Sequence, residues 1–365
     1  MRIAFIAPRY HTNQISLTQF LLKKNKVFFY VTRKAKSEDH SFLKPTIIKQ
    51  NFIFKIVKFF IKTSDPLFDY HYGIPSIREL LKFKSKKFDL VIIRDPINFM
   101  GFFYFLWAKF IGVKIIFYIQ KKIYSKNSNE LKEIIYRLFL KIFNEKSISP
   151  CLGNLKFKKV FHNLTYLPFC LSVNSYKKKW FLGNRVNIIS VGKFISRKNH
   201  LLLIRVLMSL KETVNFRLTI VGECLSNKHY IHLRKVKKEA KKSGLKISIL
   251  TNVNPKKVKY LYKKHDLFVL PSVDEPASVS NLEAMSYGLP VITTDTNSTS
   301  CYTINKVNGF VVMSNNFDSL RNKLKFFLIN KKEIKNFGKK SLSIVEKKNN
   351  PNIIYKNYFE NTLKI

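Results

Sequence analysis

Two glutamates eight positions apart, Glu275 and Glu283, are the residues of this chain whose type and spacing most suggest chemistry. They flank a short run of small residues. A carboxylate can accept hydrogen bonds from both hydroxyls of a ribose, and free amides at the start of a helix favour an anion such as a diphosphate. Helix amides that bind a diphosphate and a carboxylate slightly further in that binds a ribose would give two roles at two depths, which would explain the spacing. For an isolated pair we would favour a different explanation, in which Glu283 caps a helix or pairs with a cation at the surface and Glu275 is solvated.

A predicted strand, loop and helix must position this pair. The apolar run Asp266–Ser272 predicts a buried strand, and Val273–Val279 is the loop beyond its carboxyl end. A short helix follows, so Glu275 belongs to the loop and Glu283 to the helix. In a doubly wound sheet, ligands bind in the crevice at the carboxyl ends of the strands. Both glutamates are therefore expected at a ligand crevice.

The ends of this helix have their own signals. We expect Ser278 or Ser280 to cap its start, and Gly288 with the following proline to end it. Leu282 and Met285 are expected to face inward.

The rest of the chain alternates short apolar runs with helical patterns, which is typical of βα units and parallel sheets. Expected strands of a first domain are Arg2–Pro8, Lys26–Thr32, Asp89–Asp95 and Val113–Gln120. Those of a second domain are Val186–Lys193, Phe216–Glu223, Leu245–Thr251, Asp266–Ser272, Pro290–Asp295 and Gly309–Val312, with helices over Leu201–Lys211 and Val258–His265. The predicted fold class is α/β: two Rossmann-like, doubly wound domains facing each other across a cleft.

The domain limits follow from a change in composition. The basic, polar stretch Ser172–Arg185 is the expected connection. We predict an N-terminal domain over residues 1–172, a C-terminal domain over 173–345, and a last helix over 346–365 that returns to the N-terminal domain.

The composition limits the function class. The 67 Lys and Arg against 22 Asp and Glu give a formal charge of +45. The chain is also rich in Ile, Asn and Phe, a joint bias that indicates AT-rich coding, so we infer no specific nucleic-acid partner. Such a charge must still attract anionic membranes. Four scattered cysteines form no metal-binding spacing, and the N-terminus has no signal-peptide pattern, so a cytoplasmic protein is expected.

Three stretches together resemble a known family. The run YLYKKHDLFVLPS into the glutamate pair, the exit LEAMSYGLPVITTD, and the stretch Val191–Leu207 are similar to the GT-B glycosyltransferases of family 4, the glycosyl transferases group 1. The marker of that family is this Glu-x7-Glu motif. The resemblance covers about 120 residues in the right order and implies a retaining transfer of a sugar from a nucleotide-diphosphate sugar.

The resemblance also implies roles for particular residues. Lys193 and Lys198 match the two basic positions that bind the donor phosphates, directly after Gly192. Glu275 would contact the sugar hydroxyls, with Ser278 and Val279 beside the sugar, and Glu283 would bind the ribose. Because the lysines supply the positive charge, the expected enzyme is a metal-independent hexosyltransferase without cofactors, and no metal ligands are assigned.

In the first domain the likeness is weaker. Relatives carry glycines after the first strand, where this chain has His11, Thr12 and Asn13. Asn13 is expected to take the left-handed conformation of a missing glycine, with His11 or Thr12 near the acceptor. Gln120 stands where many relatives have a histidine near the sugar.

Several alternatives stay open. The expected acceptor is a glycan or a lipid-linked molecule, as in cell-surface polysaccharide or lipopolysaccharide biosynthesis, and the expected location is the cytoplasm, with the inner face of the cytoplasmic membrane as an alternative. Competing classes are a basic nucleic-acid-binding protein and a catalytically silent, glycosyltransferase-like binding protein. The stretch Phe52–Lys62 predicts either a helix packed on the first sheet or an element at a membrane interface, and we expect the packed helix.

Overall fold

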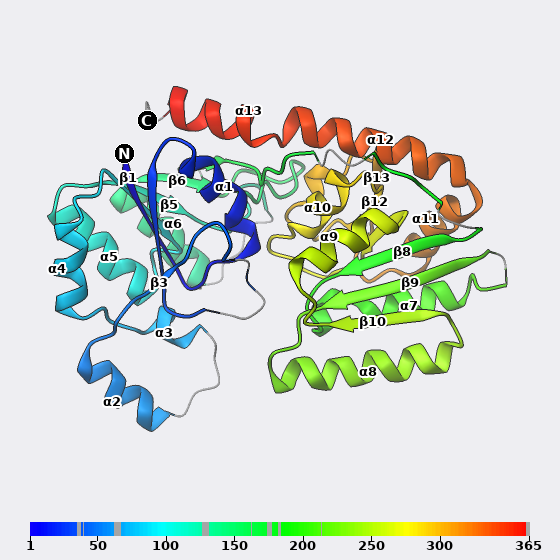
Figure 1. The fold of residues 1–365 in the computed structure, drawn as a ribbon, viewed down its shortest axis with the longest axis horizontal. Coiled ribbons are helices and arrows are strands. Elements are labelled where there is room, and N and C mark those ends of the chain that lie inside the picture. The colour runs from blue at the N-terminus through cyan, green and yellow to red at the C-terminus, as the bar shows by residue number, and fades with distance from the viewer. Residues whose placement is uncertain are drawn as a thin grey trace. The chain divides into compact units, whose positions relative to one another are not determined.

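The computed structural model describes residues 1–34, 38, 40–61, 67–125, 131–161, 163–173, 177–181, 184–212 and 214–362. It divides into two compact units, Met1–Pro150 with Leu155–Pro168, and Cys151–Asn154 with Phe169–Ile365. Each unit is a parallel sheet with helices on its faces (Figure 1). The predicted pair of Rossmann-like, doubly wound domains is confirmed.

The first unit has a seven-stranded sheet in the order β3-β2-β1-β4-β5-β6-β7. Its strands are β1 (Arg2–Ala7), β2 (Lys26–Val31), β3 (Thr46–Ile47), β4 (Leu90–Arg94), β5 (Lys114–Tyr118), β6 (Lys146–Ser149) and β7 (Leu164–Tyr166). Its helices are α1 (Thr12–Leu22), α2 (Phe52–Ile61), α3 (Phe68–His71), α4 (Ile77–Ser85), α5 (Phe99–Phe110) and α6 (Leu131–Phe143). All four predicted strands are present. The sequence analysis missed β3, β6 and β7 because they are short and partly polar.

The second unit has a six-stranded sheet in the order β10-β9-β8-β11-β12-β13. Its strands are β8 (Val186–Val191), β9 (Phe216–Gly222), β10 (Ile247–Thr251), β11 (Leu267–Leu270), β12 (Val291–Thr294) and β13 (Gly309–Val312). Its helices are α7 (His200–Met208), α8 (Asn227–Ser243), α9 (Pro255–Lys264), α10 (Ser280–Ser286), α11 (Phe317–Ile329), α12 (Lys331–Lys348) and α13 (Pro351–Lys356), followed by a π-helical turn over Asn357–Thr362. All six predicted strands are confirmed.

The order of the second sheet fixes where a ligand crevice lies. Strand β8 is central, with β9 on one side and β11 on the other. The chain order reverses at this point, so loops from both directions meet at the carboxyl ends of β8 and β11. The central strands β8 and β11 are buried along most of their length, which explains their continuous apolar runs.

The connection between the units is anchored on the second one. Lys178 is buried, and its Nζ donates to the carbonyl oxygens of Lys263 at 2.9 Å and Tyr262 at 3.2 Å at the end of α9. Burial lowers the pKa of Lys178 to about 8. Trp180 Nε1 donates to the carbonyl of Gly288 at 3.0 Å. The remainder of the predicted connection lies partly outside the described residues.

The end of the chain makes contacts within the second unit. The backbone amide of Cys170 donates to the Tyr355 hydroxyl at 3.1 Å, and Asn349 Nδ2 donates to the carbonyl of Phe169 at 2.8 Å. The return of residues 346–365 to the N-terminal domain stays a prediction.

Helix α2 differs from expectation. The sequence analysis favoured packing on the first sheet, but Phe54 is the buried residue of this helix and the other apolar side chains are exposed. The prediction of a packed helix is wrong, because α2 projects beside α3 instead of covering the sheet (Figure 1).

Candidate functional site

The predicted donor residues come from the loops after β8 and β11. Gly192 and Lys193 follow β8, and a 3₁₀ turn over Ser196–Lys198 precedes α7. The loop after β11 carries Glu275 and leads into α10. The amide of Val273 donates to the carbonyl of Arg197 at 2.8 Å, which ties the two loops together.

Lys198 and Glu275 form a buried ion pair at the edge of the second sheet where the carboxyl ends of β8 and β11 lie. Lys198 Nζ lies 2.8 Å from Glu275 Oε2, and both side chains are buried. Arg197 Nε is 3.8 Å from the same oxygen. Burial lowers the pKa of Lys198, while the adjacent Glu275 carboxylate opposes that shift. The structure thus joins directly two residues to which the sequence analysis gave separate roles.

Gly192 makes room for the lysine. A Cβ atom at this position would lie 3.0 Å from both Cδ and Cε of Lys198. The glycine therefore lets the stem of Lys198 cross the end of β8 on its way to Glu275. Gly222 is close behind, since a Cβ there would lie 2.3 Å from the carbonyl oxygen of Gly192.

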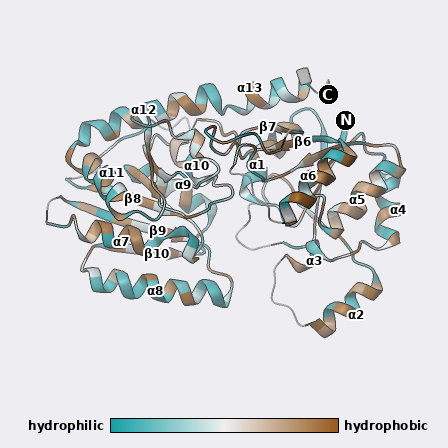
Figure 2. Ribbon diagram, turned by 180° about the vertical axis from the view of Figure 1, so that it is seen from behind, coloured by the Kyte–Doolittle hydropathy of each residue, from teal (hydrophilic) through white to brown (hydrophobic). Residues whose placement is uncertain are grey.

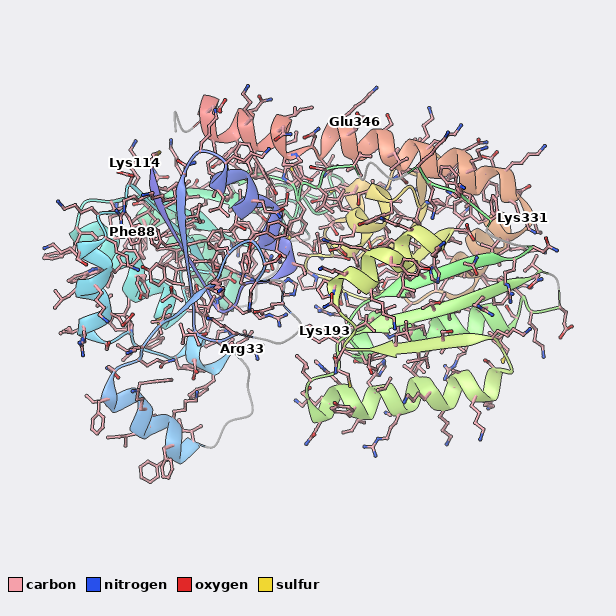
Figure 3. The ribbon with its side chains drawn as sticks, viewed as in Figure 1. Arg33, Phe88, Lys114, Lys193, Lys331 and Glu346 are labelled. Atoms are coloured by element: carbon pink, nitrogen blue, oxygen red, sulfur yellow. The ribbon has the colours of Figure 1, made fainter. Side chains whose placement is uncertain are left out.

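Lys193 lies at the same edge with a more exposed side chain (Figure 3). Its Nζ is 3.3 Å from Glu223 Oε2, at the carboxyl end of β9. Sequence reasoning did not assign a role to Glu223 or to Arg197. Glu223 directly follows β9, and Arg197 stands next to Lys198 in the loop after β8, and these positions were the signal that could have found them.

The start of α10 corrects one prediction. Its N-cap is Val279, and no side chain of the described residues caps it. The Ser278 hydroxyl lies 2.9 Å from that of Ser280, and the backbone of Ser278 bonds Thr299. The predicted serine cap is wrong because Thr299 holds Ser278 one residue before the cap position. The inward-facing Leu282 and Met285 are confirmed, both fully buried.

Glu283 lies in the first turn of α10, facing α9. The Tyr262 hydroxyl donates to Glu283 Oε2 at 3.2 Å, and the Tyr262 ring stacks on Tyr287 with centroids 5.7 Å apart. Burial raises the pKa of the Glu283 carboxyl, against the opposing effects of Tyr262 and Lys259. Tyr262, at the inner side of α9, is a further residue that sequence reasoning missed.

In the first unit, His11, Thr12 and Asn13 lie together at the start of α1. His11 is the N-cap: its Nδ1 accepts from the Asn13 amide at 3.4 Å, and its own amide donates to Gln14 Oε1 at 2.9 Å. Asn13 is helical and has no positive φ. The predicted left-handed conformation is wrong, because this capping box starts the helix where a glycine turn was expected.

Gln120 lies just beyond β5. Its Oε1 accepts from Arg94 Nη2 at 3.0 Å. The next residue after Arg94, Asp95, has a φ of 49° and accepts a hydrogen bond from the Tyr136 hydroxyl at 3.3 Å. Gln120 thus belongs to a polar group at the carboxyl ends of β4 and β5, of which the sequence analysis named only this one member.

Within the described ranges, no group of three or more His, Cys, Asp or Glu side chains is placed to hold a metal ion.

The buried His200, which follows the loop that carries Lys193 and Lys198, affects the stability of the fold in acid. His200 is fully buried at the start of α7, and burial lowers its pKa to about 3. Unfolded histidine has a pKa of about 6.5, so between these values the unfolded chain binds a proton that the folded chain excludes. Stability present above pH 6.5 is therefore lost as the pH falls, by about 2 kcal/mol at pH 5.

We predict that, between pH 7 and pH 5, the free energy of unfolding of the variant His200→Phe falls by about 2 kcal/mol less than that of the parent protein. Urea unfolding at the two pH values measures this difference. The same pH dependence in both proteins would contradict the assignment.

Comparison with known proteins adds a family for part of the chain. Residues 173–343 match the family described as "Glycosyl transferases group 1". A UDP-Gal:alpha-D-GlcNAc-diphosphoundecaprenol alpha-1,3-galactosyltransferase of Escherichia coli is 35% identical over 92 residues, 22% of this chain and 24% of that protein. An uncharacterized glycosyltransferase of Methanocaldococcus jannaschii is 32% identical over 135 residues, 36% of this chain and 33% of that protein. The matches thus span about a quarter and a third of these relatives.

A solved structure covers the whole chain. The HepE protein of Anabaena, in complex with UDP and glucose, has a TM-score of 0.75 at 11% identity and covers 100% of both chains. At this identity the similarity supports the fold, which is the predicted GT-B fold with two Rossmann-like domains.

Proposed function

We propose that the chain is a retaining glycosyltransferase, because residues 173–343 match the glycosyl transferases group 1 family and the chain has the GT-B fold. It moves a hexose from a nucleotide-diphosphate sugar to a glycan or lipid-linked acceptor. The observation that carries the proposal is the buried Lys198–Glu275 pair at the carboxyl ends of β8 and β11.

The pair suggests how the donor is received. A bound diphosphate places a second anion next to Lys198, which then interacts with both the phosphate and the Glu275 carboxylate. Glu275 gives up part of its contact with the lysine and accepts hydrogen bonds from the sugar hydroxyls. Arg197, 3.8 Å from Glu275, keeps the carboxylate from being left unpaired in a buried place.

The departing nucleoside diphosphate develops negative charge that must be stabilised in the transition state. Lys198 and Lys193 supply that positive charge from the two ends of the loop after β8. Lys193 is held 3.3 Å from Glu223, so it is oriented before the donor arrives. We expect turnover without a divalent cation, since the lysines do what Mg²⁺ does elsewhere.

The remaining candidate residues bind the ribose of the donor and the acceptor. Glu283, with Tyr262 holding one carboxylate oxygen, accepts the ribose hydroxyls through the other. Gln120 and the start of α1 at His11 and Thr12 serve the acceptor side. The Escherichia coli relative is named for a diphosphoundecaprenol acceptor, which supports a lipid-linked acceptor, cell-surface polysaccharide synthesis and contact with the inner face of the cytoplasmic membrane.

A thermal-shift panel of UDP, GDP, ADP and their hexose conjugates tests the proposal. A nucleotide at about 100 times its dissociation constant stabilises the fold by about 2.7 kcal/mol. One nucleotide should shift the transition well above the others, and Glu283→Gln should reduce that shift. Stabilisation by oligonucleotides but by none of these compounds would instead favour the nucleic-acid-binding class. Binding without donor hydrolysis would indicate a catalytically silent relative.

A further inference from the structure

Helix α2 presents its apolar side chains to solvent. Phe52, Ile53, Phe59 and Phe60 are each between 70 and 76% exposed. A helix of a globular protein usually turns its apolar face inward and its charges outward. Figure 2 shows the strongly apolar character of this segment. Leaving so much apolar surface in water is costly, so this face calls for a partner.

The contacts of α2 show that its orientation is fixed by the protein. The Asn51 side chain accepts from the Phe54 amide at 2.8 Å at the start of the helix. Phe54 stacks on Phe68 of α3 with centroids 5.8 Å apart, and Lys58 pairs with Asp69 of α3 at 2.6 Å. The buried side of α2 is therefore the side that carries Phe54 and Lys58.

Helical geometry then places the exposed residues on the opposite side. With about 100° between successive residues, Phe52, Ile53, Phe59 and Phe60 fall within an arc of about 120°. Phe54 and Lys58 lie outside this arc, on the far side of the helix axis. The anchoring contacts to α3 thus turn the most apolar part of α2 away from the body of its unit.

The charge of the chain indicates which partner covers this face. A second copy of the chain would bring a further formal charge of +45, so two copies repel each other. An anionic lipid surface is attracted by that charge and offers an apolar interior to the phenylalanines. Lys55 lies exposed beside the arc, at the position of a residue that meets lipid headgroups. Within the described ranges, no helix has the length and apolarity to span a bilayer. Helix α2 has 10 residues, fewer than the roughly 20 needed to cross a bilayer, so its insertion would be shallow.

We propose that α2 is a membrane-docking helix that inserts Phe52, Ile53, Phe59 and Phe60 into the interface of an anionic bilayer. Lys58 and Asp69 hold the helix in the docking orientation. This inference concerns the first unit and needs no donor or catalysis. It deepens the proposed function only in naming the element that brings the enzyme to a lipid-linked acceptor.

Vesicle sedimentation tests the proposal with the full chain. The vesicles are phosphatidylglycerol–phosphatidylcholine mixtures or phosphatidylcholine alone, and the variants are Phe59→Asp/Phe60→Asp and Phe59→Ser/Phe60→Ser. Both positions are exposed, so the fold should not depend on them. The matched control is Tyr230→Asp/Ile231→Asp on the lysine-rich helix α8, which makes the same charge change at exposed apolar positions.

We expect the parent protein to bind the anionic vesicles more tightly than the neutral ones. Both α2 variants should lower the partition to anionic vesicles at least about tenfold, because each loses two inserting rings. The α8 control should stay within about twofold of the parent. Donor-induced thermal shifts should be the same in all four proteins, so this result is separable from the proposed activity.

Three results would overturn the inference. The first is equal binding by the parent and both α2 variants. The second is an equal loss in the α2 and α8 variants, which would mean that charge alone drives binding. The third is a dimeric parent that becomes monomeric in the α2 variants, which would assign this face to a second copy of the chain.

Discussion

Replacing Lys198 with methionine is expected to lower donor turnover about 10²- to 10³-fold, the typical cost of removing one donor that stabilises the developing charge. The same change leaves the Glu275 carboxylate buried without its partner at 2.8 Å. Breaking a buried pair from one side costs about 3 to 5 kcal/mol, and Arg197 at 3.8 Å keeps this loss near the lower end. Turnover assays and urea unfolding measure the two effects.

A double-mutant cycle separates the two roles of the pair. Glu275→Gln alone should also destabilise the fold, since it leaves the Lys198 ammonium buried with a neutral partner. The double variant Lys198→Met/Glu275→Gln should be more stable than the sum of the single losses by more than about 1 kcal/mol. All three variants should turn over the donor at least about 10²-fold more slowly than the parent protein. Additive losses of stability, or a Lys198→Met enzyme with unchanged turnover, would contradict the assignment.

Replacing Glu283 with glutamine is expected to weaken donor binding by about 1.5 to 3 kcal/mol. The carboxylate accepts from Tyr262 through one oxygen and from the ribose hydroxyls through the other, while a neutral amide has one acceptor oxygen for both. Calorimetric titration with the preferred nucleotide measures this loss. The fold should not suffer, since burial already raises the pKa of Glu283 and so disfavours its charged form.

The control for this prediction is Tyr262→Phe. It removes the hydrogen bond that orients Glu283 at 3.2 Å and leaves the carboxylate in place. Its effect on affinity should be smaller than that of Glu283→Gln, about 1 kcal/mol. Unchanged nucleotide affinity in Glu283→Gln would refute the ribose role, and an equal loss in both variants would mean that Glu283 acts only through Tyr262.

The strands could be predicted because a buried parallel strand has a continuous apolar run. All six strands of the second unit fall within their predicted ranges for this reason. The crevice followed from the same logic, since Lys198 and Glu275 lie in loops after two adjacent strands. Their direct contact could not be predicted, because it depends on the Lys198 side chain passing close over Gly192. Such a contact depends on the three-dimensional structure and cannot be read from the order of residues.

The misses share a physical cause. The start of α10 differs from the prediction by one residue, because the N-cap is Val279 and not Ser278. The hydrogen bonds between Ser278 and Thr299, which lies far along the chain, fix this position. Asn13 was assigned from a missing glycine, whereas the local hydrogen bonds of His11 start a helix. For α2, the apolar stretch of the sequence predicts a helix but not the direction in which its apolar side chains point, which the contacts of Phe54 and Lys58 with α3 set.

The release of nucleoside diphosphate from the preferred nucleotide sugar, in excess EDTA, tests the central claim most directly. The account predicts release by the parent protein, accelerated by an acceptor, and a rate at least about 10²-fold lower for Lys198→Met. It also predicts that added Mg²⁺ or Mn²⁺ changes the rate little. No release from any nucleotide sugar that stabilises the fold would contradict the account, and so would activity that EDTA abolishes and Mg²⁺ restores.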